Sequence, residues 1–231
     1  MDRRDPRGAA QREPDLDTRT GMTVDVWWAR IDQARDEFAT DLDAVERERL
    51  AAYIHADDRK RFLLGCTMVR RLLAARFSLP AASIRLDRTC PRCGKPHGKV
   101  RADGVELSVT HAGDLVGVAI SDRPVGIDVE KVDPHLDVDG LAKVALIPEE
   151  IHELSRHDEN EKVRAFLRYW TRREAAVKAT GEGLPAKPGK ITAGIQLEEL
   201  DVDPDHVAAL AVVSAEPPVV RTFRFGSDPR R

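Results

Sequence analysis

Apolar side chains recur along the chain with two different periods, which divide it into strands and helices. Alternating patterns and short apolar runs between turn residues predict strands at residues 23–31, 105–110, 115–121, 124–130, 207–214 and 219–225. Helical spacing predicts helices at residues 43–54 and 59–77, from residue 148 onward, and at residues 160–180. We expect Asp43 to cap the first helix, and Asp57 or Asp58 to cap the second. This mixed order of strands and helices predicts an α+β fold.

Residues 1–20 differ from the rest of the 231-residue chain because they mix Arg and Asp with almost no large apolar side chains. Such a segment cannot bury enough surface to order itself, so we predict a disordered leader. The N-terminus has no apolar core of the kind that a secretory signal needs. The remaining length is ample for one large domain or two packed halves.

Composition narrows the functional classes. The net charge is −3, with 33% charged and 42% hydrophobic residues, which argues against a nucleic-acid or membrane-surface partner. No run of 18 apolar residues occurs, so we expect no membrane span. Three cysteines are an odd and low number, and a reducing cytoplasm is the simplest location for them.

Asp128 and Glu130 stand two positions apart in the segment VGIDVE, residues 125–130. Side chains alternate along a strand, so Ile127 and Val129 should share one face and the two carboxylates the other. The α-carbons of the two acids would lie roughly 6.5–7 Å apart. Carboxylates at that spacing can converge on a hard cation such as Mg²⁺. The same pattern is also typical of a solvated strand face, so both interpretations stay open at this point.

Glu174 and Lys178 continue the apolar stripe of the last predicted helix. That stripe is marked by Val163, Phe166, Leu167 and Trp170. A carboxylate on a buried face needs a partner, because an unpaired buried charge is costly. Glu174 could therefore be a third metal ligand or a base, with Lys178 beside an anionic substrate. The alternative is an ordinary Glu–Lys pair one turn apart on an exposed helix.

A loop at residues 88–104 contains the sequence CPRCGKPHGK, residues 90–99. Cys90, Cys93 and His97 suggest a zinc site, but the remaining cysteine, Cys66, falls inside a predicted helix and no second cysteine pair exists. A phosphate- or nucleotide-binding loop is the functional alternative. Its glycines would allow close backbone approach, and His97 and the lysines would supply donors. A plain surface turn is the third interpretation.

Five segments together resemble the surfactin-type 4′-phosphopantetheinyl transferases. The segment at residues 125–132 resembles their G-I-D-(V/I)-E motif, and WTRREAAVKATGEGL, residues 170–184, resembles their W-(S/T)-x-K-E motif and its G-x-G-L ending. LSVTHAG, residues 107–113, CGKPHGK, residues 93–99, and the basic helix at residues 56–70 resemble three more motifs of the family. All five stand in the family's order and spacing, and the resemblance covers about residues 25–215.

The resemblance implies two similar α+β halves in one chain. We expect an N-terminal half at residues 21–122 and a C-terminal half at residues 123–231, with the active site in the cleft between them. The implied reaction moves 4′-phosphopantetheine from coenzyme A to a serine of an apo acyl or peptidyl carrier protein and releases 3′,5′-ADP. It uses Mg²⁺. We expect a monomer, because the family completes its cleft within one chain.

The resemblance also implies roles for individual residues. The implied ligands of Mg²⁺ on the coenzyme A pyrophosphate are Asp128, Glu130 and Glu174. The expected coenzyme A contacts include His97, which we name as a donor of the loop. The full set is Arg47, Arg49, Arg61, Lys95, Pro96, His97, Thr110, His111 and Lys178. Among these, Thr110 and His111 would meet the 3′-phosphate. Glu174 and Lys178 are the implied catalytic residues.

Three positions depart from the family pattern: Arg173 stands for a usual Lys, Thr110 for a usual Ser, and Val100 for a frequent Pro. None of them removes an implied metal ligand, so we expect an active enzyme. Two rival functions remain from the residues alone. One is another Mg²⁺-dependent nucleotide pyrophosphate hydrolase, and the other is a non-enzymatic, zinc-bearing binding module.

Overall fold

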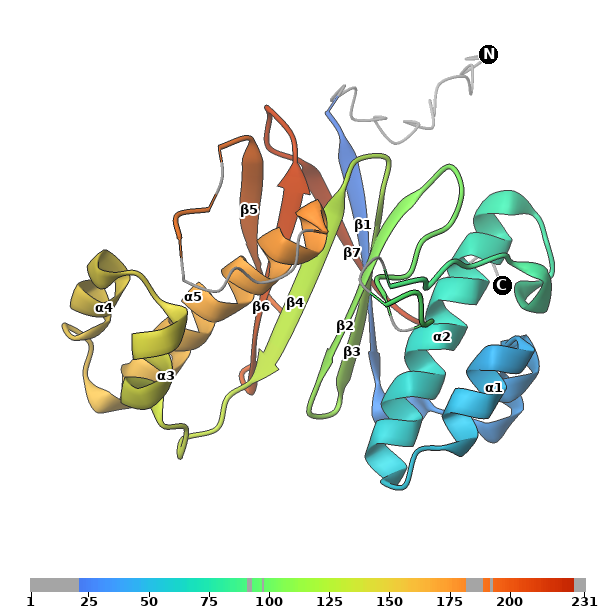
Figure 1. Ribbon diagram of the computed structural model, residues 1–231, viewed down its shortest axis with the longest axis horizontal. Helices are drawn as coiled ribbons and strands as arrows, with labels where there is room; N and C mark the ends of the chain where they lie inside the picture. Colours follow the sequence, from blue (N-terminus) through green and yellow to red (C-terminus); the bar gives the residue numbers. More distant parts are fainter. Residues whose placement is uncertain (1–20, 91–92, 97, 182–188, 192, 227–231) are drawn as a thin grey trace, which may run out of the picture.

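The structure, a computed structural model, describes residues 21–90, 93–96, 98–181, 189–191 and 193–226. The leader predicted at residues 1–20 and the candidate donor His97 lie outside these residues. The strands are β1 (Thr23–Arg30), β2 (Glu106–Ala112), β3 (Leu115–Ser121), β4 (Val125–Lys131), β5 (Ile195–Leu200), β6 (His206–Val213) and β7 (Val219–Arg224). The helices are α1 (Ala44–Ala51), α2 (Ala56–Phe77), α3 (Val138–Ala145), α4 (Pro148–Leu154) and α5 (Glu159–Thr180). The predicted α+β class is confirmed (Figure 1).

The strands form two sheets, with the orders β2-β3-β1-β7 and β4-β6-β5. The first sheet holds the strands of the N-terminal half together with β7, the last strand of the chain. β7 runs parallel to β1, with Thr23 opposite Val219. The C-terminal strand therefore crosses the boundary that we predict at residues 122/123, and it ties the two halves together (Figure 1).

The two sheets meet where β4 runs alongside β2. The Ser108 hydroxyl accepts a hydrogen bond of 3.1 Å from the backbone N–H of Ile127, and the Thr110 hydroxyl accepts one of 3.1 Å from the N–H of Val129. Both pairs are separated by 19 residues, so the two strands run in the same direction. Buried backbone donors need partners. Two hydroxyls of β2 thus act as hydrogen-bond acceptors for backbone N–H groups on the edge of β4 that is not paired within its own sheet.

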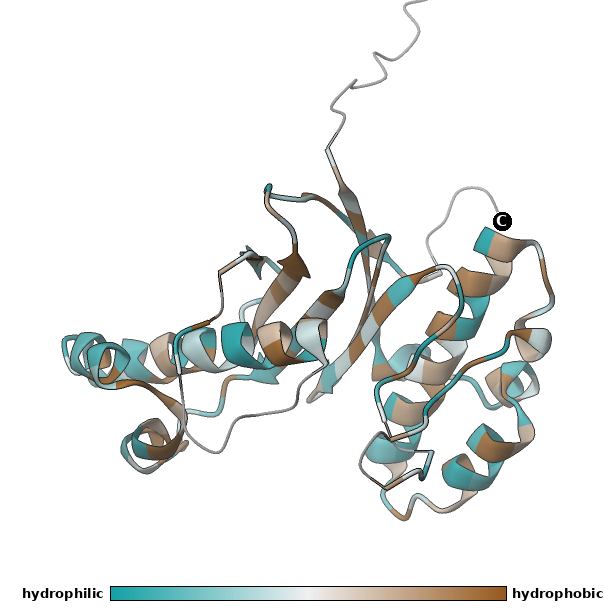
Figure 2. Cartoon of the chain, turned by 45° about the horizontal axis from the view of Figure 1, so that its top comes forward, coloured by the Kyte–Doolittle hydropathy of each residue, from teal (hydrophilic) through white to brown (hydrophobic). Residues whose placement is uncertain are grey.

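Helices cover the outer faces, and apolar residues fill the space between the layers. Leu64, Met68 and Leu73 of α2 pack on the first sheet with Val116 and Val118. A second cluster between the two sheets is built from Val24, Val26, Trp28, Leu115, Ala119, Val125, Ile127, Val129, Ala208, Leu210 and Val212. The long helix α5 covers the other face of the second sheet. Figure 2 shows that α2 and α5 carry both hydrophobic and hydrophilic residues, as helices with one buried face do.

The helix starts agree only in part with the sequence. Asp43 caps α1, because its carboxylate accepts a 2.8 Å hydrogen bond from the N–H of Glu46. The prediction that Asp57 or Asp58 caps the second helix is wrong: α2 already begins at Ala56, after His55. The two aspartates instead occupy the first turn of α2, where a negative charge is favourable.

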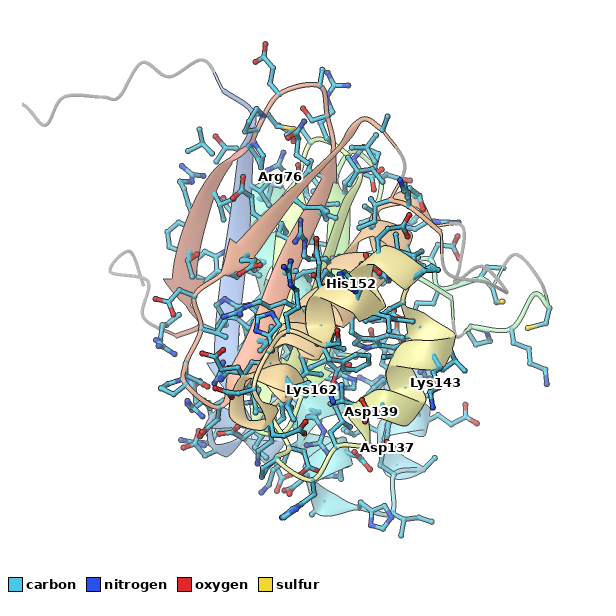
Figure 3. All side chains as sticks on the ribbon, turned by 90° about the vertical axis from the view of Figure 1, so that its left-hand side faces the viewer. Arg76, Asp137, Asp139, Lys143, His152 and Lys162 are labelled. Atoms are coloured by element: carbon cyan, nitrogen blue, oxygen red, sulfur yellow. The ribbon has the colours of Figure 1, made fainter. Side chains whose placement is uncertain are left out.

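Helix α3 was not expected from the sequence. It is capped by Asp137, whose side chain accepts a 3.0 Å hydrogen bond from the N–H of Gly140. Lys162 of α5 then forms a 2.8 Å ion pair with Asp139, which links the two helices on the face shown in Figure 3. With only eight residues, α3 offers too few turns for its apolar spacing to stand out. In the part of the chain that the structure describes, no helix combines the length and the apolar character needed to cross a membrane.

Candidate active site

Strand β4 sends its side chains in two directions, as the sequence predicts. Ile127 and Val129 are buried between the two sheets. Gly126 and Asp128 face α5 instead. A side chain at Gly126 would overlap the carbonyl oxygen of Ala175 and come within 2.5 Å of the nitrogen of Ala179. The absence of a side chain at Gly126 therefore allows α5 to lie directly on β4 and brings the acids of the two elements together.

The Asp128 carboxylate is buried, with 5% of the residue exposed, and it is held from two sides. Lys178 of α5 donates a 2.7 Å hydrogen bond to its Oδ1, and the Thr110 hydroxyl lies 3.3 Å from the same oxygen. The other oxygen, Oδ2, is buried without a hydrogen-bond partner among the described residues. Burial raises the pKa of Asp128 above its ordinary value, although Lys178 and Thr110 oppose the shift. Asp128 thus keeps one carboxylate oxygen for a further cation.

Glu130 and Glu174 lie near the same place, one on β4 and one on α5. The indole N–H of Trp170 donates a 3.0 Å hydrogen bond to Glu130, so the helix also orients this second acid. Burial, and next to it the charge of Asp128, raises the pKa of both Glu130 and Glu174. Carboxylates that raise one another's pKa are close enough to repel. Asp128 therefore lies close enough to both glutamates for its charge to disfavour their ionised forms.

The three acids do not form a closed metal site. Among the residues that the structure describes, no group of three or more His, Cys, Asp or Glu side chains is gathered tightly enough to hold a metal ion. The chemistry nonetheless fits Mg²⁺, which prefers carboxylate oxygens and leaves several positions to water or phosphate. The unpartnered Oδ2 of Asp128 and the mutual repulsion are two features that a cation would relieve.

A cavity of about 530 Å³ lies between the two halves and reaches Lys178, the partner of Asp128. Its walls come from α1 and the residues just after it, from α2, β2 and the end of α5, and from the loop that precedes β2. Five cationic side chains line it together with His111: Arg49, Arg61, Arg88, Lys99 and Lys178. Tyr53 and Phe62 add an aromatic surface. A cavity with this lining suits a ligand that carries several negative charges and a flat ring system.

Two of the three early arginines that we named lie at this cavity. Arg49 donates a 3.0 Å hydrogen bond to the carbonyl of Pro96, and its guanidinium carbon lies 5.1 Å from the centre of the Phe62 ring. Arg61 pairs with Asp58 at 2.7 Å. Arg47 instead donates to the carbonyl of Leu42 and is not among the described lining residues.

Of the remaining candidate contacts with coenzyme A, some line the cavity and others do not. His111 is in the cavity wall, and burial, followed by the charge of Arg61, lowers its pKa. The Thr110 hydroxyl is engaged by Asp128 and by the backbone of β4. Lys95 and Pro96 are exposed in the loop and do not occur among the described residues that line the cavity. The structure therefore brings Arg49, Arg61, His111 and Lys178 together.

Arg88 is a cavity cation that sequence reasoning missed. Its guanidinium pairs at 2.6 Å with Glu46, which is 1% exposed and also binds the fully buried Arg70. A buried carboxylate between two arginines is stable only when all partners are present. Arg88 is the first residue of the loop at residues 88–104, but its contact with Glu46 spans 42 residues and has no local signal.

Lys99, one of the two lysines of the cysteine loop, joins the two halves. It donates hydrogen bonds to the carbonyls of Lys178, at 2.8 Å, and Val125, at 3.2 Å. Burial lowers its pKa. Arg173, which departs from the family pattern, points elsewhere: it pairs with Glu150 of α4 and donates to the carbonyl of Gly189. That departure therefore leaves the cavity lining unchanged.

Comparisons with known proteins agree with this geometry. Residues 124–228 match the family model "4'-phosphopantetheinyl transferase superfamily", and residues 27–123 match "4'-phosphopantetheinyl transferase, N-terminal". The 4'-phosphopantetheinyl transferase HetI of Nostoc sp. is 28% identical over 208 residues, which cover 82% of this chain and 87% of the relative. The 4'-phosphopantetheinyl transferase Sfp of Bacillus subtilis is 28% identical over 152 residues, 66% of each chain.

A more distant organism offers a third relative. The L-aminoadipate-semialdehyde dehydrogenase-phosphopantetheinyl transferase of Mus musculus is 28% identical over 178 residues, which cover 68% of this chain and 51% of the relative. The two family matches together run from residue 27 to residue 228 and confirm the resemblance seen in the motifs. The chain therefore belongs to the 4′-phosphopantetheinyl transferase superfamily, in the group of enzymes similar to Sfp.

Proposed function

We propose that this enzyme takes 4′-phosphopantetheine from coenzyme A and attaches it to a serine hydroxyl of an apo acyl or peptidyl carrier protein. The reaction releases 3′,5′-ADP and depends on Mg²⁺. The observation that carries the proposal is the juxtaposition of a cation-lined cavity with a group of acids from β4 and α5. Coenzyme A has a matching layout, with a phosphorylated nucleoside at one end of a pyrophosphate.

The cavity side chains would bind the nucleotide end of coenzyme A. Arg49, Arg61 and Arg88 offer planar guanidinium donors, which suit phosphate oxygens. His111 lies in the same wall, and its lowered pKa favours a neutral ring that still has one N–H to donate. Lys178 stands at the junction, because it lines the cavity and also contacts Asp128. We therefore place the pyrophosphate near Lys178.

Asp128, Glu130 and Glu174 would hold Mg²⁺, which when bound neutralises charge on the pyrophosphate. The serine oxygen forms a bond to the phosphorus that bears pantetheine, and the bond from that phosphorus to the bridging oxygen breaks. The leaving group is 3′,5′-ADP. Glu174 would accept the serine proton as the general base.

The natural carrier and setting form a finer part of the proposal. HetI and Sfp, the bacterial relatives, lead us to propose a carrier of secondary metabolism, such as polyketide or nonribosomal peptide synthesis. We also propose that the enzyme acts as a monomer, because one chain supplies all the walls of the cavity described above. The cytoplasmic location expected from the sequence stays a prediction.

The test is a mass measurement on a carrier protein. The enzyme is incubated with coenzyme A, Mg²⁺ and an apo carrier, and we expect the carrier to gain one phosphopantetheine while 3′,5′-ADP appears in equal amount. Dephospho-coenzyme A should bind at least about tenfold more weakly, since each charge-assisted hydrogen bond to the 3′-phosphate contributes about 1.5–3 kcal/mol. Cleavage of coenzyme A without a change in carrier mass would support a pyrophosphate hydrolase instead. Stoichiometric zinc in the purified protein, together with an unmodified carrier, would support a zinc-bearing binding module.

A further inference from the structure

Glu46 is a buried acid in the first turn of α1, and the proposed reaction does not use it. It stands three residues after the cap Asp43, the position at which a glutamate completes a capping box. Only 1% of the residue is exposed. Arg70 of α2 and Arg88, which lines the cavity between the halves, both pair with its carboxylate. The acid therefore connects the interior of the N-terminal half with the cavity wall.

The two carboxylate oxygens of Glu46 have different partners. Oε2 accepts a 3.3 Å hydrogen bond from the backbone N–H of Asp43 and a second one from Nε of Arg70. Oε1 accepts a 2.6 Å hydrogen bond from Nη2 of Arg88. Oε2 thus takes part in the local structure of α1 and α2, and Oε1 links that structure to a cation of the cavity.

Arg70 holds Glu46 in a fixed place. Its side chain is 0% exposed, and Nε donates to Glu46 while Nη2 donates to Asp43. Nη1 donates to the backbone carbonyls of Ala81, at 3.1 Å, and Ile84, at 3.0 Å. Each guanidinium nitrogen is therefore engaged, by α1 on one side and by the segment after α2 on the other. A carboxylate bound to so constrained a partner can set the position of another side chain.

Arg88 keeps donors for a ligand. Its side chain is 17% exposed and lines the cavity. Among the described residues, both of its side-chain contacts run through Nη2, which lies 2.6 Å from Glu46 and 3.7 Å from Sγ of Cys66. Nε and Nη1 have no acceptor within the described part of the chain. These nitrogens can donate to phosphate oxygens, which suit a guanidinium.

Cys66 does not compete with Glu46 for this arginine. Burial, followed by the charge of Glu46, raises the pKa of the Cys66 thiol to about 12. The thiol is therefore neutral at pH 7, and its sulfur is a weak acceptor. The ion pair with Glu46 is the stronger of the two contacts and decides where the guanidinium of Arg88 lies.

We propose that Glu46 is a positioning residue which, anchored by Arg70, holds the guanidinium of Arg88 in the cavity wall so that it donates to phosphate oxygens at the nucleotide end of coenzyme A. The proposal rests on the proposed function, in which Arg88 binds that end. Glu46 does not touch the ligand. Its loss should raise the KM for coenzyme A with a smaller change in kcat, because the contact is made before and during the bond-making step alike.

The direction of the effect separates positioning from charge alone. Glu46→Gln removes a negative charge beside a cavity lined with cations, and by charge alone this should strengthen the binding of an anion. Positioning predicts weaker binding. The glutamine can complete the capping box with its one side-chain oxygen, which also serves Arg70. It then presents an amide N–H group, a second donor, to Arg88.

Titration calorimetry on the full chain at constant salt measures this effect with two probes, coenzyme A and 3′,5′-ADP. We expect Glu46→Gln to weaken the binding of both by the same factor, about 10- to 100-fold, as for the loss of one charge-assisted hydrogen bond. Glu48→Gln is the matched control, because it removes the same charge from an exposed position on α1. It should bind both probes at least as tightly as the wild type. A folded Glu46→Gln protein that does the same would overturn the proposal.

A double variant tests whether Glu46 acts through Arg88. Arg88→Ala should weaken the binding of coenzyme A, and Glu46→Gln added to it should cause no further loss, because the residue that Glu46 positions is already gone. Losses that simply add in the double variant would show that Glu46 acts by another route and would contradict the proposal.

A second substitution covers the case in which Glu46→Gln does not fold. Glu46→Asp keeps the charge but shortens the side chain by one methylene group, so its carboxylate cannot reach both arginines. We expect weaker binding of both probes, and wild-type affinity in a folded Glu46→Asp protein would overturn the positioning role. Wild-type protein that binds neither probe would instead sink the proposed function. Tight binding by the wild type and by the folded Glu46 variants alike would remove this inference alone.

Discussion

Lys178 and Asp128 form a 2.7 Å ion pair that links the last turns of α5 to the middle of β4. The pair is asymmetric, because Lys178 satisfies only one oxygen of the carboxylate, while Oδ2 is buried without a hydrogen-bond partner in the described part of the chain. The lysine also donates a 3.1 Å hydrogen bond to the carbonyl of Ile127. Lys178 therefore links α5 to β4 and leaves Oδ2 of Asp128 without a hydrogen-bond donor among the described residues, so that this oxygen could bind a second cation.

Removing the lysine should destabilise the protein. In Lys178→Met the buried Asp128 carboxylate loses its cation, and we expect the free energy of unfolding to fall by about 1–3 kcal/mol, as for a buried polar group left unpaired. The double variant Lys178→Met/Asp128→Asn removes the uncompensated charge as well. It should regain most of the stability without regaining transfer activity. Urea unfolding gives the stabilities, and a double variant no more stable than Lys178→Met would contradict this account of the pair.

The closeness of β4 and α5 can be tested at Gly126. A methyl group there would collide with the backbone of α5 at Ala175 and Ala179, which cannot move aside as a flexible side chain could. We expect Gly126→Ala to lower the free energy of unfolding by about 1–3 kcal/mol or more and to abolish most of the transfer. Gly189→Ala is the matched control, because a side chain at Gly189 would meet nothing within 4 Å. Similar melting temperatures for the two variants would show that the strand and helix have room between them.

The ionised side chain of Glu174 should lower the free energy of unfolding of the protein. Burial, and then the charge of Asp128, raises its pKa, so the folded chain binds a proton at Glu174 more readily than the unfolded chain. The ionised carboxylate therefore lowers stability above the raised pKa, and the penalty disappears as the pH falls below the unfolded value. Without Mg²⁺ or coenzyme A, Glu174→Gln should be more stable than the wild type at pH 7, and the difference should shrink towards acid.

Urea midpoints between roughly pH 3 and pH 8, a range that includes the ordinary Glu pKa of about 4.3, measure this difference. Glu216→Gln serves as the control, since Glu216 is exposed. A wild type that stays more stable than Glu174→Gln at pH 7 would show that Glu174 is not under repulsion from its neighbours.

Local patterns in the sequence predicted much of the site because its main residues follow a strand period and a helix period. Alternation placed Asp128 and Glu130 opposite the core, and the apolar stripe led from Trp170 to Glu174. Both features depend only on neighbours within a few residues. The hydrogen bond from Trp170 to Glu130 spans 40 residues and could not be read in the same way.

The features that the sequence did not predict are contacts between distant segments. The ion pair between Glu46 and Arg88 depends on how α1 packs against the loop at residues 88–104. The pairing of β7 with β1 joins the two ends of the described chain. The Thr110 hydroxyl looks like a ligand contact in its motif, yet it is engaged in joining β2 to β4. Such roles follow from which elements pack together, and periodicity in a single sequence does not encode that choice.

The most direct test of the central claim is the rate at which Glu174→Gln modifies an apo carrier protein at ordinary and at raised Mg²⁺. The substitution keeps the shape of the side chain and removes its charge. If Glu174 takes the serine proton, turnover should fall by about 10²–10⁴-fold and stay low at raised Mg²⁺, while coenzyme A still binds. If Glu174 only holds the metal, raised Mg²⁺ should restore much of the rate, as we expect for Asp128→Asn. Turnover close to that of the wild type at ordinary Mg²⁺ would contradict the assignment of the three acids as the reaction centre.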